Sequence, residues 1–227
     1  NEERGAGRPA RVRPTYEMLK NMGAVFGLNC GWEHTLWYAD EPGVKETNGF
    51  TRQNWFEPVG REVKMLRDHA GIIDISNFAN YEVKGSGAAE WLDQLLANRI
   101  PSEVGRSCLS PLIGVRGGVA GDFTVTKVAE DSFMMIGSGM AERYHQRFFN
   151  NVTLPKGTTF AIKTDDICGY NVAGPKSRAL LQRLTNADLT AENFRFMRSQ
   201  TIEVAGVACL AIRVSFTGDL GWELHCA

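Results

Sequence analysis

The stretch "YEVKGSGAAEWLDQLL", residues 81–96, has the pattern of a strand that ends at a glycine turn and leads into an amphipathic helix. Its first part alternates apolar and polar residues, which is typical of a half-buried strand. In its second part the apolar residues recur at helical spacing and share one face. They are Ala88, Trp91, Leu92, Leu95 and Leu96. The same order of features returns in "YNVAGPKSRALLQRLT", residues 170–185.

The two stretches match at several positions with one constant offset of 89 residues. The matching pairs are Tyr81/Tyr170, Val83/Val172, Gly85/Gly174, Leu92/Leu181 and Leu95/Leu184. A strand, a turn and one helix cannot bury an apolar face alone, so a repeated unit predicts two copies packed into one architecture. We therefore predict an α+β fold that is duplicated, with pseudo-twofold symmetry.

Further elements are predicted around these stretches. A helix is expected over 60–70, and "GIIDIS", residues 71–76, is expected to be a buried strand. Strands are also expected at 107–113, 123–129 and 132–137, a helix at 142–152, extended chain at 158–166 and two strands between 200 and 224. We assign 58–227 to one domain, with repeats near 72–160 and 161–227.

Residues 1–57 are predicted to be a linker or arm of irregular chain. The first part, "NEERGAGRPARVRP", is polar and contains Gly and Pro. Aromatic rings then crowd among Gly, Pro and Asn, at Trp32, Trp37, Phe50, Trp55 and Phe56. Two interpretations are open: the rings anchor the arm to the core or to a partner domain, or they form a stacking platform for a ligand.

Composition excludes several classes of function. The chain has 227 residues and is 43% hydrophobic, which is enough for one sizeable core or two small intertwined ones. Lys and Arg number 25 against 26 Asp and Glu, so nucleic acid and anionic membrane surfaces are not expected partners. No apolar run reaches the ~20 residues of a membrane span.

The cysteines and histidines do not form a recognisable metal or disulfide pattern. The cysteines are scattered and odd in number, without a CxxC pair, which argues against zinc and a disulfide framework and favours a reducing compartment. The histidines, His34, His69, His145 and His225, also lack metal-ligand spacing. His145 is expected on a charged, solvated helix face.

The two ends suggest a piece of a longer protein. The first residue is Asn1, and the last stretch, "GDLGWELHCA", stops inside a predicted strand. We therefore expect that the chain is cut at both ends and that the domain is truncated at its C-terminus.

Two acids are the candidate functional residues. Asp122 lies in "RGGVAGDFTV", residues 116–125, where glycines permit close approach of a ligand and a strand follows at once. Glu223 lies between Trp222 and Leu224, so its side chain points to the face opposite theirs. If those two residues face the core, Glu223 faces a cavity or solvent. In a cavity it could accept two N–H groups of a heterocycle in a bidentate manner, whereas in solvent it is an ordinary strand carboxylate.

Nearly the whole chain resembles a known family. The stretches "GIIDISNFANYEVKGSGAAEWLDQLLANRIPSEVGR", "RGGVAGDFTV", "VAGPKSRALLQRL" and "SFTGDLGWEL" are similar to the folate-binding fold of the glycine cleavage T-protein (aminomethyltransferase) family. The stretches "GRPARVRPTYEMLKNMGAVFGLNCGWEHTLWYA" and "RQNWFEPVGREV" resemble the segment that joins the FAD part to the folate part in dimethylglycine and sarcosine dehydrogenase-like members. The resemblance implies a duplicated fold that continues, in the complete family form, into a C-terminal β-barrel that this chain lacks.

The resemblance implies tetrahydrofolate chemistry. Asp122 matches the family acid near the reacting nitrogens, where a carboxylate orients the nitrogen, stabilises positive charge or accepts a proton. Glu223 matches the glutamate that holds the pterin ring. Phe216 stands at an aromatic position that is usually Tyr, and Leu109 stands where active members commonly carry Tyr. These two departures remove hydroxyl groups but leave both acids in place.

The implied activity is transfer of a one-carbon unit from an iminium or methylated amine to tetrahydrofolate, giving methylene-tetrahydrofolate. The FAD that oxidises the amine would sit in a domain outside this chain, which makes that domain a partner. The expected compartment is the cytoplasm of a bacterium or the mitochondrial matrix of a eukaryote. Two alternatives are a non-catalytic regulatory or binding subunit of the same architecture, to which Leu109 and Phe216 are suited, and a free-standing aminomethyltransferase.

Overall fold

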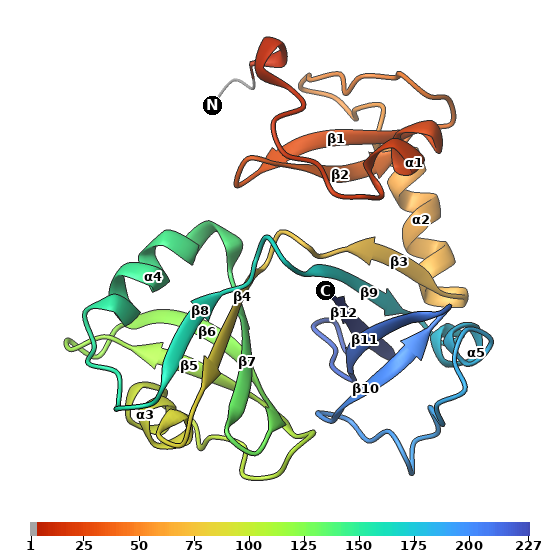
Figure 1. Ribbon diagram of the computed structural model, residues 1–227. Coiled ribbons are helices and arrows are strands. Elements are labelled where there is room, and N and C mark those ends of the chain that lie inside the picture. The colour runs from red at the N-terminus through yellow and green to blue at the C-terminus, as the bar shows by residue number, and fades with distance from the viewer. Residues whose placement is uncertain (1–3) are drawn as a thin grey trace.

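The computed structural model describes residues 4–227, which form an N-terminal hairpin and two larger units of sheet and helix (Figure 1). The α-helices are α1 (Tyr16–Asn21), α2 (Phe56–Asp68), α3 (Ala88–Leu95), α4 (Glu142–Asn150) and α5 (Ser177–Gln182), and the 3-10 turns are η1 (Gly5–Gly7) and η2 (Gly139–Ala141). The strands are β1 (Ala24–Asn29), β2 (Trp32–Tyr38), β3 (Gly71–Asp74), β4 (Ala79–Lys84), β5 (Ser107–Ile113), β6 (Val119–Ala129), β7 (Ser132–Gly137), β8 (Thr159–Ile162), β9 (Cys168–Ala173), β10 (Ser199–Val204), β11 (Val207–Ile212) and β12 (Gly221–Cys226).

Two five-stranded sheets have the same plan, which confirms the predicted duplication. The first sheet has the order β5-β6-β7-β4-β8 and the second sheet β10-β11-β12-β9-β3. The offset of 89 residues that aligns Tyr81 with Tyr170 also carries β4 onto β9 and β7 onto β12. Even the register is kept, because Tyr81 lies opposite Met135 and Tyr170 lies opposite Leu224.

The two repeats exchange their first strands. β3 directly precedes β4 but pairs with β9, while β8 directly precedes β9 but pairs with β4. Along the chain, the order α2-β3-β4-α3-β5-β6-β7 therefore returns as α4-β8-β9-α5-β10-β11-β12. This order divides the repeats between β7 and α4, whereas the boundary predicted from the sequence, between repeats near 72–160 and 161–227, falls within β8. A four-residue strand carries too little periodicity to show which sheet it joins.

Equivalent hydrogen bonds tie the crossing chains together. Ser76 Oγ accepts a bond from the backbone N–H of Gly169 at 2.9 Å, and Thr164 Oγ1 accepts one from the N–H of Asn80 at 3.0 Å. The buried Arg13 from the arm lies between the two, since its Nη2 donates to the carbonyl oxygens of Ser76 (2.6 Å) and Thr164 (3.1 Å). A single arginine thus fastens the arm at the place where the repeats cross.

The matched glycines are required by close backbone contacts. Gly85 and Gly174 have φ values of +122° and +112°, which L side chains rarely adopt. A Cβ at Gly85 would lie 2.2 Å from the carbonyl oxygen of Gly157, and one at Gly174 would lie 2.6 Å from that of His69. The absence of a side chain at each turn therefore leaves room for backbone from the other repeat. That backbone precedes β8 at Gly85 and β3 at Gly174.

Each sheet has its own core, and a smaller cluster joins the two sheets. The core of the first sheet is rich in rings, with Tyr81, Phe123 and Phe149 completely or almost completely buried. The core of the second sheet is built around Trp222 and Phe194, whose rings meet edge to face at 6.2 Å. This arrangement corresponds to the two intertwined cores that the composition allows.

The arm is more ordered than the sequence predicted. β1 and β2 form an antiparallel hairpin in a stretch that we expected to be irregular. Its turn is made by Cys30 and Gly31, both with positive φ, and the many aromatic residues hid the strand pattern on each side. Trp37 is buried in a cluster with Trp55 and with Val59 of α2, as an anchoring ring should be. Phe50, in contrast, is fully exposed.

The strand expected to be buried at 71–76 is only partly so. Ile72 and Ile73 of β3 are 65% and 51% exposed, because β3 is the edge strand of the second sheet. Apolar runs of this length fit both a central and an edge strand, and the sequence does not distinguish them. Among the described residues no helix is long and apolar enough to cross a membrane.

Candidate functional site

The two sheets contact each other through one face of each, which we call the inner faces. Met134 and Ile136 of β7 lie in one buried cluster with Ile212 of β11. The opposite faces carry the residues of the two separate cores. Side chains alternate between the two faces of a strand. On β6, β7, β11 and β12, a side chain that does not point into its own core therefore points to the inner face.

Asp122 lies on the inner face of the first sheet. It belongs to β6, and its neighbour Phe123 is completely buried in the core, so the carboxylate points the other way. Asp122 is exposed and makes no side-chain hydrogen bond with any residue of 4–227. The preceding Gly121 has a clear reason to be glycine: a Cβ there would lie 2.5 Å from Nε2 of His145.

His145 is buried, which corrects the expectation that it is solvated. It is completely buried, and its Nδ1 lies 3.0 Å from the hydroxyl oxygen of Tyr81. Burial lowers the pKa of His145, and the negative charges of Asp122 and Glu142 oppose that shift. The charged residues of α4 hid this position in the sequence, although His145 and Phe149, four residues apart, form the buried side of the helix.

Glu223 lies on the inner face of the second sheet. Its neighbours Trp222 and Leu224 are both buried in the core, so the condition set by the sequence is met and Glu223 points away from that core. It lies opposite Ile212 of β11, and its side chain is 22% exposed. Its Oε2 is 3.2 Å from Nε2 of His225. The carboxylate is thus half-buried, with remaining acceptor capacity.

The sequence analysis did not single out His225, although the repeat contains a signal for it. The offset of 89 residues aligns Glu223 with Met134 and His225 with Ile136. Two positions of the inner face that are apolar in the first sheet therefore carry a carboxylate and an imidazole in the second. Polar groups at buried positions are costly, so this difference between the repeats marks the place as a candidate site.

The other two predicted residues are exposed apolar side chains. Leu109 of β5 lies opposite Thr124 on the inner face of the first sheet and is 56% exposed. Phe216 lies in the loop between β11 and β12 and is fully exposed. The structure thus puts Leu109 and Asp122 on one inner face and Glu223 on the facing one, with Phe216 in a loop of the second sheet.

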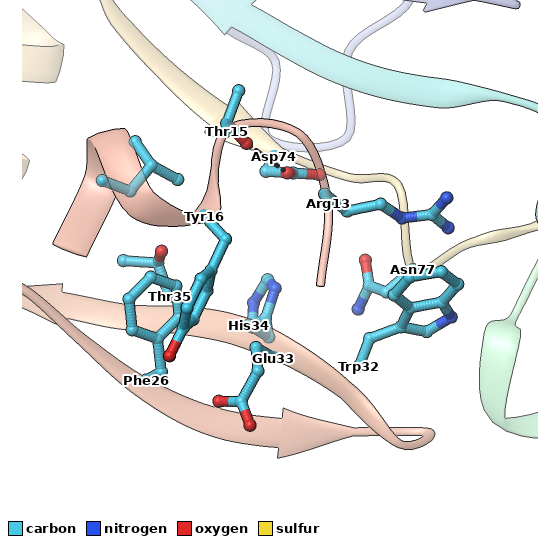
Figure 2. A pocket seen from close by; sticks show the side chains of 11 residues that line it. Arg13, Thr15, Tyr16, Phe26, Trp32, Glu33, His34, Thr35, Asp74 and Asn77 are labelled. Atoms are coloured by element: carbon cyan, nitrogen blue, oxygen red, sulfur yellow. Dashed lines mark hydrogen bonds between the residues drawn. The ribbon is translucent and has the colours of Figure 1, made fainter. Parts of the chain in front are cut away.

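A separate pocket lies where the arm meets the core (Figure 2). Tyr16, His34 and Trp32 line it from the arm, and Asp74 lines it from the end of β3. The guanidinium of Arg13 stacks on the Trp32 ring at 3.5 Å. The enclosed volume of about 10 Å³ is the size of about one water molecule, so we interpret this pocket as part of the arm's attachment.

An open groove of about 570 Å³ lies between the arm, α4 and β8. Most of its lining side chains are charged, with both signs present: Arg11, Glu142, Arg143 and Asp165, beside Ile162 and Thr164. None of the predicted site residues lines this groove or the pocket of Figure 2. Among residues 4–227 no group of three His, Cys, Asp or Glu is placed to hold a metal ion.

A family model described as the GCVT N-terminal domain matches residues 15–227. Mitochondrial dimethylglycine dehydrogenase of Mus musculus is 37% identical, over 99% of this chain and 26% of its own length. The 4-methylaminobutanoate oxidase (formaldehyde-forming) of Paenarthrobacter nicotinovorans is 30% identical, over 99% and 27%. A mitochondrial pyruvate dehydrogenase phosphatase regulatory subunit of Mus musculus is 26% identical, over 96% and 26%. The chain spans about a quarter of the length of these curated relatives.

The fold also matches a solved structure. The glycine cleavage system aminomethyltransferase T from Bartonella henselae superposes with a TM-score of 0.76 over 96% of this chain and 54% of that chain, at 23% sequence identity. The match confirms the predicted mixed helix and sheet architecture.

Proposed function

We propose a function from the premise that this chain belongs to the family of the GCVT N-terminal domain, whose model matches residues 15–227. The proposed function is that of the tetrahydrofolate-dependent one-carbon transfer domain of an FAD-linked N-methyl amine dehydrogenase. Whole-chain similarity to dimethylglycine dehydrogenase supports this choice among the activities of the family. The FAD belongs to a part of the protein outside this chain. The compartment is the mitochondrial matrix if the source is a eukaryote and the cytoplasm if it is a bacterium.

The observation that carries the proposal is the place of Glu223. A carboxylate stands on a face between the sheets where the other repeat has Met134. The pterin ring of tetrahydrofolate has an exocyclic amino group beside a ring N–H, and a carboxylate accepts such a pair in a bidentate manner. Since Oε2 takes one bond from His225, three of the roughly four lone-pair directions of Glu223 remain for a ligand.

Asp122 is proposed to act on the reacting nitrogen. When bound, tetrahydrofolate supplies the amine nitrogens that take up the one-carbon unit. An exposed carboxylate that has no hydrogen-bond partner among residues 4–227 is free to accept a proton from such a nitrogen or to stabilise positive charge beside it. Leu109 and Phe216 would contribute apolar contacts to the flat rings, without the hydroxyl groups of tyrosine.

A second candidate function is a non-catalytic binding subunit of the same architecture. The similarity to the pyruvate dehydrogenase phosphatase regulatory subunit favours it, together with Leu109 and Phe216 in place of hydroxyl-bearing residues. A free-standing aminomethyltransferase is the third possibility. These functions differ in whether the protein binds tetrahydrofolate and whether amine oxidation accompanies the transfer.

Calorimetric titration of the full-length protein with tetrahydrofolate tests the binding half of the proposal. We expect binding, and we expect Glu223→Gln to weaken it by about 1–3 kcal/mol, because one N–H of the pterin would then face an amide N–H instead of an oxygen. Absence of binding would remove the folate assignment and favour the binding-subunit alternative. Equal affinity of the variant would exclude Glu223 from holding the pterin ring.

Formaldehyde release during amine oxidation tests the transfer half. Asp122→Asn should increase the formaldehyde that escapes in the presence of tetrahydrofolate and leave the rate of amine oxidation unchanged. Asp131→Asn is the matched control, since Asp131 is an exposed aspartate in the turn between β6 and β7. A variant at Asp122 that captures the one-carbon unit as well as the unsubstituted protein does would exclude this residue from the reaction.

A further inference from the structure

We infer that His225 is a positioning residue for Glu223, which holds the carboxylate in one orientation so that the site selects ligands by their N–H groups. The inference rests on the proposed function, because it assigns a specificity role within the same site. The hydrogen bond between the two side chains is the starting observation: His225 Nε2 and Glu223 Oε2 are 3.2 Å apart.

For a neutral ring, the surroundings of His225 favour the tautomer with its proton on Nε2. Its side chain is only 2% exposed, and Nδ1 is buried without a hydrogen-bond partner among the described residues. Nδ1 lies over Gly169, where an added Cβ would be 3.4 Å away. A neutral ring with its proton on Nε2 donates to the carboxylate and leaves only a lone pair at Nδ1. The opposite tautomer would bury an unpaired N–H and bring two acceptors together.

The other repeat shows that the scaffold does not need a histidine here. Ile136 occupies the equivalent place on β7, and the pairing register of β7 with β4 is the same as that of β12 with β9. Ile136 is buried in the cluster between the sheets. A buried imidazole with one unpaired nitrogen is less stabilising than isoleucine at the same position. We therefore attribute the presence of His225 to its contact with the carboxylate of Glu223.

Fixing one carboxylate oxygen has a consequence for recognition. Glu223 is exposed enough to change rotamer, and the bond from His225 restrains the plane of its carboxylate. A restrained carboxylate meets a pair of N–H donors with little loss of conformational freedom. A site built in this way also rejects an analogue that lacks one donor, because an acceptor is then left unpaired.

The test compares two probes on the full-length protein: tetrahydrofolate and its analogue with a methyl group in place of the exocyclic amino group. We expect the unsubstituted protein to prefer tetrahydrofolate by about tenfold or more. His225→Ile, which copies Ile136, should reduce this preference to a few-fold. His225→Gln should restore most of it, because its amide can still donate to Glu223, whereas the shorter His225→Asn should not.

The outcomes separate the inference from the function on which it rests. If the unsubstituted protein binds neither probe, the proposed function fails and the inference fails with it. If tetrahydrofolate binds but His225→Ile lowers the affinity of both probes by the same factor, His225 is merely structural and the inference alone is overturned. If His225→Ile does not fold, the Gln and Asn variants decide, since equal preference in these two would contradict a donor role.

Discussion

The two repeats have the same strand order, the same register and the same exchanged first strand, yet their inner faces differ in chemistry. The first repeat presents Met134 and Ile136 from β7, and the second presents Glu223 and His225 from β12 at the equivalent places. Shared features are therefore those that packing requires. The differences are the better guide to function. At each such position, the residue in the other repeat shows that the fold forms without the polar side chain.

The same comparison applies to the other acid. Thr124 lies opposite Ile136, and Leu210 lies opposite His225. Counting along β6 and β11 from these pairs, the place of Asp122 is taken by Ala208 in the second repeat. Each acid thus occurs in one repeat only, so a symmetric fold carries an asymmetric pair of carboxylates.

The largest expected effect concerns what the repeats share. Phe133 and Trp222 occupy equivalent places in the two cores, and both are completely buried. Replacing either by Ala should lower the free energy of unfolding by about 3–5 kcal/mol, through lost apolar contact and a cavity. Urea unfolding followed by circular dichroism measures this loss. A loss below about 1 kcal/mol at one position would show that the two cores are not equivalent.

The glycine turns give the next largest effect, with a control inside the second repeat. Gly174 and Gly206 both have positive φ, but only Gly174 would bring a Cβ into contact with backbone, at 2.6 Å from the carbonyl oxygen of His69. Gly206→Ala should cost about 1–2 kcal/mol for the left-handed conformation alone. Gly174→Ala should cost more in the same urea experiment. Equal costs would show that the exchanged segment gives way easily.

The buried His145 gives stability a dependence on pH. Burial lowers its folded pKa below the ordinary value of 6.5, so the unfolded chain binds a proton that the folded protein does not. Stability should therefore fall as pH falls below about 6.5, by at most about 1.4 kcal/mol per pH unit for this one group. His145→Gln should make the fall less steep in urea titrations at several pH values. The contribution of His34, whose pKa burial also lowers, stays in both proteins.

The smallest effect concerns thiol reactivity. Burial raises the pKa of Cys226 to about 12, beside Cys209 on the neighbouring strand, whereas Cys30 is exposed in the hairpin turn. Burial also raises the pKa of Cys30, but this thiol is exposed. Alkylation near pH 8 should therefore modify Cys226 at least about tenfold more slowly than Cys30, since the thiolate is the reactive form. Mass spectrometry of the digested protein measures both rates. Fast modification of Cys226 would mean that the end of β12 opens.

The features that could be predicted from the sequence are those with a local residue pattern. The strand, glycine turn and helix at 81–96 and their return at 170–185 predicted the duplication, because periodicity and a constant offset are local features. The exchange of β3 and β8 was not predictable, since four-residue strands do not indicate their pairing partner. The hairpin of the arm was missed because its aromatic residues were interpreted as irregular chain.

One feature of the candidate site, the orientation of Glu223, was predictable in the same way. Alternation around Glu223 predicted that it points away from its core, and the structure agrees because Trp222 and Leu224 are buried. The burial of His145 was missed because its helix is mostly charged. His225 was missed because its spacing does not match a metal-ligand pattern. Its place becomes informative only when it is compared with Ile136, the equivalent residue in the other repeat.

The most direct measurement of the central claim is a crystal structure of the full-length protein with folinic acid, a stable formyl derivative of tetrahydrofolate. The account predicts that the pterin ring lies between the inner faces, with its amino group and ring N–H within hydrogen-bond distance of Glu223 and its reacting nitrogens beside Asp122. A ligand bound elsewhere, or one that touches only one of the two carboxylates, would contradict it.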